Sequence, residues 1–282
     1  MENEIELKIM LLPENIAVVS DWLNQQNIFT QDKDILANTY YDSPELFFAK
    51  HKMGLRVRSK NNQHEMTLKM KGEIVGGLHI RPEYNLDLPN NQPDFKRLVS
   101  HFNLQIENSD TLADNLIPTF STDFTRHKWL IKYQNSQIEI ALDQGLVKND
   151  AGEEAICEVE FELKQGELSD LIQLLEKMPK TNGMWLSSLS KAQRGYLVGK
   201  PQVIAKEIEK LTACNVETLS EVDKYQLAQQ VADFIRLEGN PKLVDLYQQL
   251  DPQFNSLQAM DYLVSSDYLI NNIQHIKAFY LK

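Results

Sequence analysis

The sequence predicts an α+β fold, in which a closed antiparallel β-barrel with a charged interior is flanked by helices and followed by a small all-α region. Three observations favour it. Several segments in the first 200 residues alternate between charged and apolar side chains with a period of two, which indicates strands with one charged face. Two segments between them have helical spacing. After Lys200-Pro201 the alternation ends, so we expect one domain over residues 1–200 and another over 201–282.

The strand at the start of the chain shows the pattern most clearly. In Glu4–Ile9, three charged side chains share one face, and Ile5, Leu7 and Ile9 share the other. The same alternation, or an extended pattern close to it, is found in Leu55–Arg58, Thr67–Lys71, His79–Leu88, Thr125–Tyr133, Glu139–Asp143 and Glu158–Leu163.

Helices are expected at Pro13–Gln25 and Glu167–Met178, where apolar residues recur on one side. Pro13 suits the first helical turn, because a proline there loses no hydrogen bond that the helix would make. These two helices could cover the apolar outer face of the barrel. Beyond residue 200 the expected helices are Ile204–Leu211, Leu219–Leu237, Leu243–Leu250 and a last stretch up to Lys282.

Like charges recur two residues apart on the charged faces. Arg56 and Arg58 share one face, Lys69 and Lys71 share another, and the strand from Glu158 carries three carboxylates. Such neighbours repel each other, so the pattern indicates faces that converge on a hydrated channel where ligands neutralise them. Carboxylates suit hard divalent cations, and guanidinium groups suit phosphate oxygens. We therefore expect Mg²⁺ or Mn²⁺ together with a phosphate-rich anion.

Composition narrows the function further. The net charge is −11, from 29 basic and 40 acidic residues, which argues against general binding to nucleic acid or to an anionic membrane. The two cysteines, Cys157 and Cys214, lack metal-site spacing and favour a reducing compartment. Because the first residues also lack the layout of a signal peptide, we expect a cytoplasmic protein.

An ordered set of motifs resembles the CYTH superfamily, also called triphosphate tunnel metalloenzymes, and is most similar to its bacterial inorganic triphosphatases. The opening Glu4-Ile5-Glu6-Leu7-Lys8 resembles the ExExK signature of that family. The remaining motifs follow in family order at Tyr40–Pro44, Gly54–Arg58, Thr67–Lys71, Gly76–Tyr84, Phe120–Phe124, Ile138–Asp143, Glu158–Leu163 and Ser190–Tyr196.

The resemblance implies an eight-stranded antiparallel tunnel that hydrolyses inorganic triphosphate to pyrophosphate and phosphate with one or two divalent metals. The implied catalytic residues are Glu4, Glu6, Lys8 and Glu160. The implied metal ligands are Glu4, Glu6, Asp143, Glu158 and Glu160. The implied substrate-binding residues are Lys8, Arg56, Arg58, Lys69, Lys71, Arg81, Glu83, Arg126, Lys191 and Arg194, with Glu139 and Glu162 as further candidates.

Alternatives stay open at this point. A thiamine triphosphatase or an adenylate cyclase would use the same tunnel, because a fold alone does not select a substrate. A non-catalytic polyphosphate-binding module is a third hypothesis, although it would gain nothing from the acidic metal-facing positions. Relatives of this branch often carry a following helical CHAD domain. Here residues 201–282 are shorter than that domain and acidic, with seven basic and eleven acidic residues, so their role is left open between a divergent relative and an interaction module.

Overall fold

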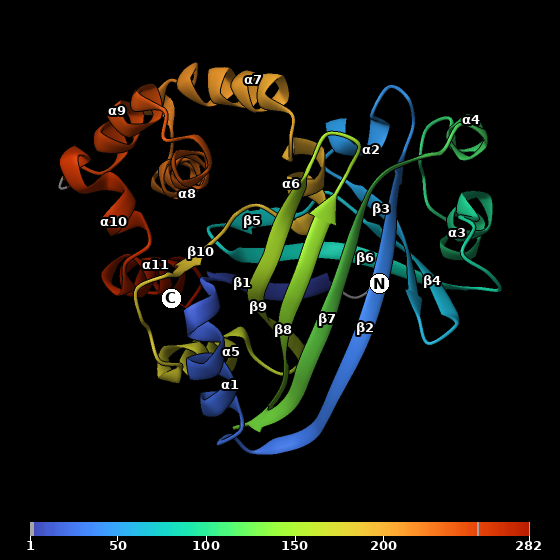
Figure 1. Ribbon diagram of the computed structural model, residues 1–282, viewed down its shortest axis with the longest axis horizontal. Coiled ribbons are helices and arrows are strands. Elements are labelled where there is room, and N and C mark those ends of the chain that lie inside the picture. Colours follow the sequence, from blue (N-terminus) through green and yellow to red (C-terminus); the bar gives the residue numbers. More distant parts are fainter. Residues whose placement is uncertain (1–2, 253, 282) are drawn as a thin grey trace.

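Eight antiparallel strands form a closed barrel in the computed structural model, which describes residues 3–252 and 254–281 (Figure 1). Around the barrel the order is β1-β9-β8-β7-β2-β3-β4-β6, and β6 pairs back onto β1. The strands are β1 (Asn3–Leu11), β2 (Ile28–Asp42), β3 (Gly54–Lys60), β4 (Gln63–Lys69), β6 (Leu78–Leu88), β7 (Ile117–Tyr133), β8 (Ser136–Lys148) and β9 (Glu153–Gln165). Short strands β5 (Glu73–Val75) and β10 (Met184–Leu186) pair with β6 and β1. The predicted fold class is confirmed.

Charged side chains line the barrel and apolar side chains cover its outside, as the alternation predicts. On β1, Leu7 and Ile9 are buried in an apolar cluster outside the barrel, while Lys8 lies on the opposite face of the strand. Because directly opposed residues share a face of the sheet, the pairing of Lys8 with Glu160 places both side chains in the interior.

Helices cover the apolar outside. The predicted helix Pro13–Gln25 is a 3₁₀ turn, η1 (Pro13–Asn15), followed by α1 (Ile16–Leu23), and the second predicted helix is α5 (Leu168–Lys177). Both pack in one apolar cluster with β1, β7, β8 and β9. On the other side of the barrel, α3 (Phe95–Phe102) and α4 (Ser109–Asp114) pack against β3, β4 and β6. Two short helices, α2 (Phe47–Lys50) and α6 (Lys191–Leu197), lie beside the barrel.

The chain after residue 200 is helical, as predicted. Its elements are α7 (Pro201–Thr212), η2 (Val216–Thr218), α8 (Glu221–Glu238), α9 (Pro241–Leu250), η3 (Ser256–Gln258), α10 (Ala259–Leu263) and α11 (Ser266–Tyr280). They have an apolar cluster of their own, with Val231 and Leu243 at its centre. However, Leu269, Ile273 and Ile276 of α11 belong to the cluster outside β1. The helical region is therefore packed onto the barrel wall, and a boundary at residue 200 stays a prediction.

Two features differ from the sequence expectations. The 15-residue strand β2 is not visible as an alternating segment, because its first half is exposed on both faces. Strand β4 ends at Lys69, so Lys71 lies outside the strand and is exposed.

None of the helices in the described part of the chain combines the length and the hydropathy that a membrane-spanning helix requires.

Candidate active site

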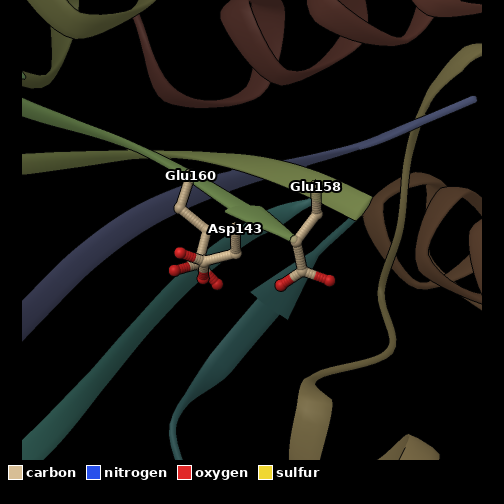
Figure 2. Close-up of side chains that lie close together, drawn as sticks. All are labelled: Asp143, Glu158 and Glu160. Carbon is tan, nitrogen blue, oxygen red and sulfur yellow. The ribbon is translucent and has the colours of Figure 1, made fainter. Parts of the chain in front are cut away.

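Three buried carboxylates form the centre of the site. Asp143 of β8 and Glu158 and Glu160 of β9 bring their oxygens within 4.8 Å of one another. We call them the acidic trio; Figure 2 shows their carboxylates pointing to the same side. Asp143 lies directly opposite Glu158 in the sheet, and the period of two puts Glu160 on the same face. Asp143 and Glu158 are fully buried, so their charges require partners.

Four cations neutralise the trio. Lys8 Nζ lies 3.1 Å from Glu158 and pairs with Glu160 as well. Lys191 Nζ lies 2.7 Å from Asp143 and 3.0 Å from Glu160, and it also pairs with Glu158. The other two are guanidinium groups. Arg126 donates to both oxygens of Asp143 at 2.8 and 2.7 Å and to Glu160 at 2.6 Å, and Arg194 donates to Glu158 at 2.8 Å.

These partners keep Asp143 and Glu160 ionised. Burial alone would raise the pKa of Glu160, but the charges of Lys191, Lys8 and Arg126 outweigh it and hold the pKa well below its usual range. Burial also opposes ionisation of Asp143, and Arg126 and Lys191 lower its pKa in the same way. The carboxylates of Asp143 and Glu160 are therefore anionic at neutral pH and available as ligands.

A second group of ion pairs lies further along the barrel, on β1, β4 and β6. Lys69 bonds to both oxygens of Glu4, at 2.5 and 2.6 Å, and lies 2.8 Å from Glu83. Arg81 bonds to Glu4 at 3.3 Å and to Glu6 at 2.8 Å. The structure thus places Glu4 and Glu6 with basic side chains, and the acidic trio does not include them.

The two carboxylates of β1 have opposite pKa shifts. Burial raises the pKa of Glu4 to about 7, and Glu6 adds to the shift against the opposing charge of Lys69. Burial also disfavours the charge of Glu6, but Lys69 and Lys8 outweigh it and lower its pKa. Near neutral pH, Glu4 is therefore the better proton acceptor of the two.

Arg56 and Arg58 of β3 form the basic wall of the tunnel. Arg58 donates to Asn38 at 2.9 Å and, among the described residues, forms no ion pair with a carboxylate. Burial lowers the pKa of Arg58 to about 9, and the charges of Arg56 and Arg126 add to this shift. Such crowding of cations is relieved when an anion binds between them.

The remaining predicted residues lie at the edges of this site. Glu139 lines a cavity of ≈ 550 Å³ together with Arg58, Arg126 and Lys128, beside the turn between β3 and β4. Glu162 lies between Glu139 and Glu6 in the sheet. Lys71 is exposed beyond the end of β4, and the structure does not bring it to the other cations.

Sequence reasoning missed several polar residues of the interior. Asn38 and Tyr40 of β2 face Arg58 and Arg56, opposite which they lie in the sheet. His79 is fully buried, and both of its ring nitrogens lack a hydrogen-bond partner. It lies opposite Glu6, and the alternation of β6 puts it on the same face as Arg81. This signal could have identified it as an interior residue.

The acidic trio fits a divalent metal. Its donors are all carboxylate oxygens, which suit Mg²⁺ and Mn²⁺, and their separation of at most 4.8 Å allows one ion to reach all three. Lys8 and Lys191 contact the same oxygens of Glu158 and Glu160. A bound ion would therefore share these oxygens with the ammonium groups or displace the ammonium groups from them.

Comparison with known proteins agrees with this geometry. The CYTH domain matches residues 2–196. The chain belongs to the CYTH family. An inorganic triphosphatase from Haemophilus influenzae is 41% identical over 211 residues, which are 74% of this chain and 59% of that protein. The chain thus spans about three fifths of the length of this curated relative.

Solved structures of similar fold include a candidate adenylyl cyclase from Hippeastrum, described as having a dominant triphosphatase activity. It is 17% identical, with a TM-score of 0.49 over 68% of this chain and 95% of that chain. A candidate adenylate cyclase from Bacillus halodurans is 20% identical, with a TM-score of 0.39 over 63% and 90% of the two chains. At these values, neither structure says anything about the activity of this CYTH protein.

Proposed function

We propose that this CYTH protein is a metal-dependent inorganic triphosphatase, which hydrolyses triphosphate to pyrophosphate and phosphate inside its tunnel. The 41% identity to the Haemophilus enzyme supports the proposal. The observation that carries it is that the basic wall of Arg56 and Arg58, together with Arg126, lies beside three buried carboxylates. A metal and a polyphosphate are the ligands that this combination of charges would stabilise together.

We assign the binding of phosphate oxygens to the cations that face the interior. Arg58 is available without breaking an ion pair, since its side-chain partner is the amide oxygen of Asn38. Arg126 joins the acidic trio to the cavity beside the β3–β4 turn, because it lines that cavity and also bonds to Asp143 and Glu160. The other proposed phosphate ligands are Lys8, Arg56, Lys69, Arg81, Lys191 and Arg194.

The acidic trio would hold the metal, which when bound would offset phosphate charge and lower the pKa of a coordinated water. In the reaction, the oxygen of water forms a bond to a terminal phosphorus and the bond from that phosphorus to the bridging oxygen breaks. The bridging oxygen leaves with pyrophosphate, and its charge is offset by the basic side chains of the tunnel.

The proton lost by water requires an acceptor. We propose Glu4 for this role because burial raises its pKa to about 7, close to the working pH of a general base. Lys69 donates to both oxygens of Glu4 and would have to release one of them. Glu160 suits it poorly, because its neighbouring cations hold its pKa well below the usual range. Glu6 and Glu83 would keep Lys69 and Arg81 in place around Glu4.

The test is phosphate release from triphosphate with Mg²⁺, with Mn²⁺ and with excess EDTA. Pyrophosphate, ATP, thiamine triphosphate and long-chain polyphosphate serve as competing substrates under the same conditions. We expect triphosphate to have the highest kcat/KM and EDTA to abolish the activity. A preference for ATP or thiamine triphosphate would refute the substrate assignment, and tight binding of triphosphate without hydrolysis would refute the enzymatic one.

A further inference from the structure

Lys191 differs from Lys8 and Arg126 in how its backbone is held. Arg194 shares the helix of Lys191, but its guanidinium is also bound by Glu154 and by the backbone oxygen of Ala155. Lys8 and Arg126 belong to strands of the barrel, whose hydrogen bonds fix their positions. Lys191 is the first residue of α6, which follows β10 after a four-residue connection, 187–190. The place of its ammonium group in the tunnel therefore depends on what holds this connection, in addition to the bonds that Asn149 and Tyr196 make between α6 and the barrel side.

The connection is held by the C-terminal helical region. Asp233 of α8 accepts two hydrogen bonds at one carboxylate oxygen, from the backbone N–H of Ser188 at 2.7 Å and from its hydroxyl at 2.6 Å. Its other oxygen accepts from Arg236 at 2.6 Å. Asp233 is 5% exposed and Ser188 is 3% exposed, so these bonds are shielded from water and strengthened by the low dielectric.

Arg236 extends the same attachment to β10. One of its nitrogens donates to the backbone oxygen of Leu263 at 3.0 Å. Its guanidinium lies over the ring of Trp185 at 5.5 Å and over that of Tyr268 at 5.6 Å. Trp185 is the middle residue of β10 and lies opposite Met10 of β1. The helical region thus contacts the chain both before and within the connection that precedes Lys191.

The first turn of α6 connects Ser188 and its neighbours, which the helical region holds, to the tunnel. The hydroxyl of Ser190 accepts from the backbone of Gln193 at 3.2 Å, and the Gln193 side chain accepts from the backbone N–H of Ser190 at 2.9 Å. This capping box fixes where the helix begins. Lys191 directly follows the cap, and its Nζ contacts all three members of the acidic trio.

From these contacts we infer that the C-terminal helical region positions an active-site side chain, with Asp233 as the positioning residue for Lys191. Asp233 touches neither the trio nor the tunnel interior, and acts by holding Ser188. The inference rests on the proposed function only in assigning Lys191 to substrate binding. It gives the helical region a role that its acidic sequence leaves open.

Kinetics of four proteins test the inference: the wild type, Asp233→Leu, Lys191→Met and the double variant. We expect Asp233→Leu to lower kcat/KM for triphosphate about tenfold, mainly by raising KM, but to lower it less than about twofold in the Lys191→Met background. Asp233→Asn keeps an oxygen for Ser188 and should stay closer to the wild type than Asp233→Leu. An equal loss in both backgrounds would overturn the inference.

A second measurement does not depend on activity. An amine-reactive acetylating reagent labels accessible lysines, and mass spectrometry measures the rate at each position. Lys191 and Lys8 are 6% and 2% exposed and contact the same carboxylates, so Lys8 is an internal reference. In Asp233→Leu we expect the labelling rate of Lys191 relative to Lys8 to rise about tenfold, because only Lys191 is held through Ser188.

Asn272→Leu is the matched control. Asn272 is 4% exposed in the same helical region and bonds to Gln229 at 2.6 Å, so its loss destabilises these helices without removing the bonds to Ser188. We expect its Lys191-to-Lys8 ratio to equal that of the wild type. If Asp233→Leu and Asn272→Leu raise the ratio equally, or if neither does, the inference is wrong. If the wild type fails to hydrolyse triphosphate, the proposed function is wrong while the labelling ratio still decides the position of Lys191.

Discussion

Removing the ammonium group of Lys8 should make the stability of the protein depend on divalent metal. Lys8 is 2% exposed and pairs with both Glu158 and Glu160. Lys8→Met keeps the length of the side chain but leaves the buried carboxylates with one cation fewer. Breaking a buried ion pair in this way costs about 3–5 kcal/mol. At about 2–4 °C per kcal/mol for a protein of this size, the melting temperature should fall by about 6–20 °C.

Metal should reverse part of this loss. A cation that binds the acidic trio at about 100 times its Kd adds about 2.7 kcal/mol of stability. We therefore expect Mn²⁺ or Mg²⁺ to raise the melting temperature of Lys8→Met more than that of the wild type, because the variant has one positive charge fewer beside the carboxylates and repels the metal less. Circular dichroism melts in excess EDTA and in excess metal measure both quantities.

Lys128→Met is the matched control for the Lys8 variant. Its side chain is 27% exposed and its nitrogen lies 3.8 Å from Asp34, a geometry worth less than about 1 kcal/mol. It should melt close to the wild type with either EDTA or metal. A Lys8→Met protein that melts like Lys128→Met in EDTA, or that metal stabilises no more than the wild type, would refute the electrostatic account of the site.

Three further outcomes are expected. Arg126→Met should lower kcat/KM for triphosphate by about a hundredfold or more, since this guanidinium bonds to Asp143 and would offset the charge of the phosphate in the proposed reaction. A loss of only about tenfold or less in steady-state assays would count against that role. Gly195→Ala should lower both melting temperature and activity, because a Cβ there would lie 2.2 Å from the ring of Phe120; unchanged melting would contradict this packing. Burial and the charge of Arg81 lower the pKa of His79 from 6.5 to about 3, so its contribution to stability is complete above about pH 6.5 and is lost as the pH falls toward 3. Urea unfolding of His79→Leu should therefore show a pH slope shallower than that of the wild type by up to about 1.4 kcal/mol per pH unit over this range, and identical slopes would contradict it.

The alternation of residue types was enough to predict the inner and outer faces of strands such as β1 and β9. A strand has a period of two, so charged positions such as Lys8 and Glu160 fall on the face opposite the apolar ones, whatever the register. The apolar outer face in turn requires cover, and α1 and α5 supply it. The prediction of a closed barrel therefore needs only two premises. The strands alternate between charged and apolar residues, and like charges on one face are destabilising unless they converge on a channel where ligands neutralise them.

The partners of each charge could not be predicted in the same way. Spacing places Glu4 and Glu6 on the inner face, but their neighbours across the barrel depend on its closure and on the reach of Lys69 and Arg81. The end of a strand is equally hard to predict, which is why Lys71 was expected inside and is exposed.

The start of α6 had a usable signal. The pattern Ser190-x-x-Gln193 is a capping box, and it marks the helix from which Lys191 enters. No sequence pattern indicates that this helix is attached to α8. The bond from Ser188 to Asp233 joins residues 45 positions apart, which is beyond the range of a local motif.

The closure of the barrel by β1 has a consequence for synthesis on the ribosome. Lys8 and its partner Glu158 are 150 positions apart, a distance that translation covers in about 8–30 s at about 5–20 residues per second. Until β6 is made, the nascent first strand has none of its final neighbours, and from then until β9 emerges it has only β6. Its apolar side meanwhile lacks most of its cover. A chain released before β9 emerges would keep two open sheet edges, so premature termination should produce aggregation-prone fragments rather than a smaller working barrel.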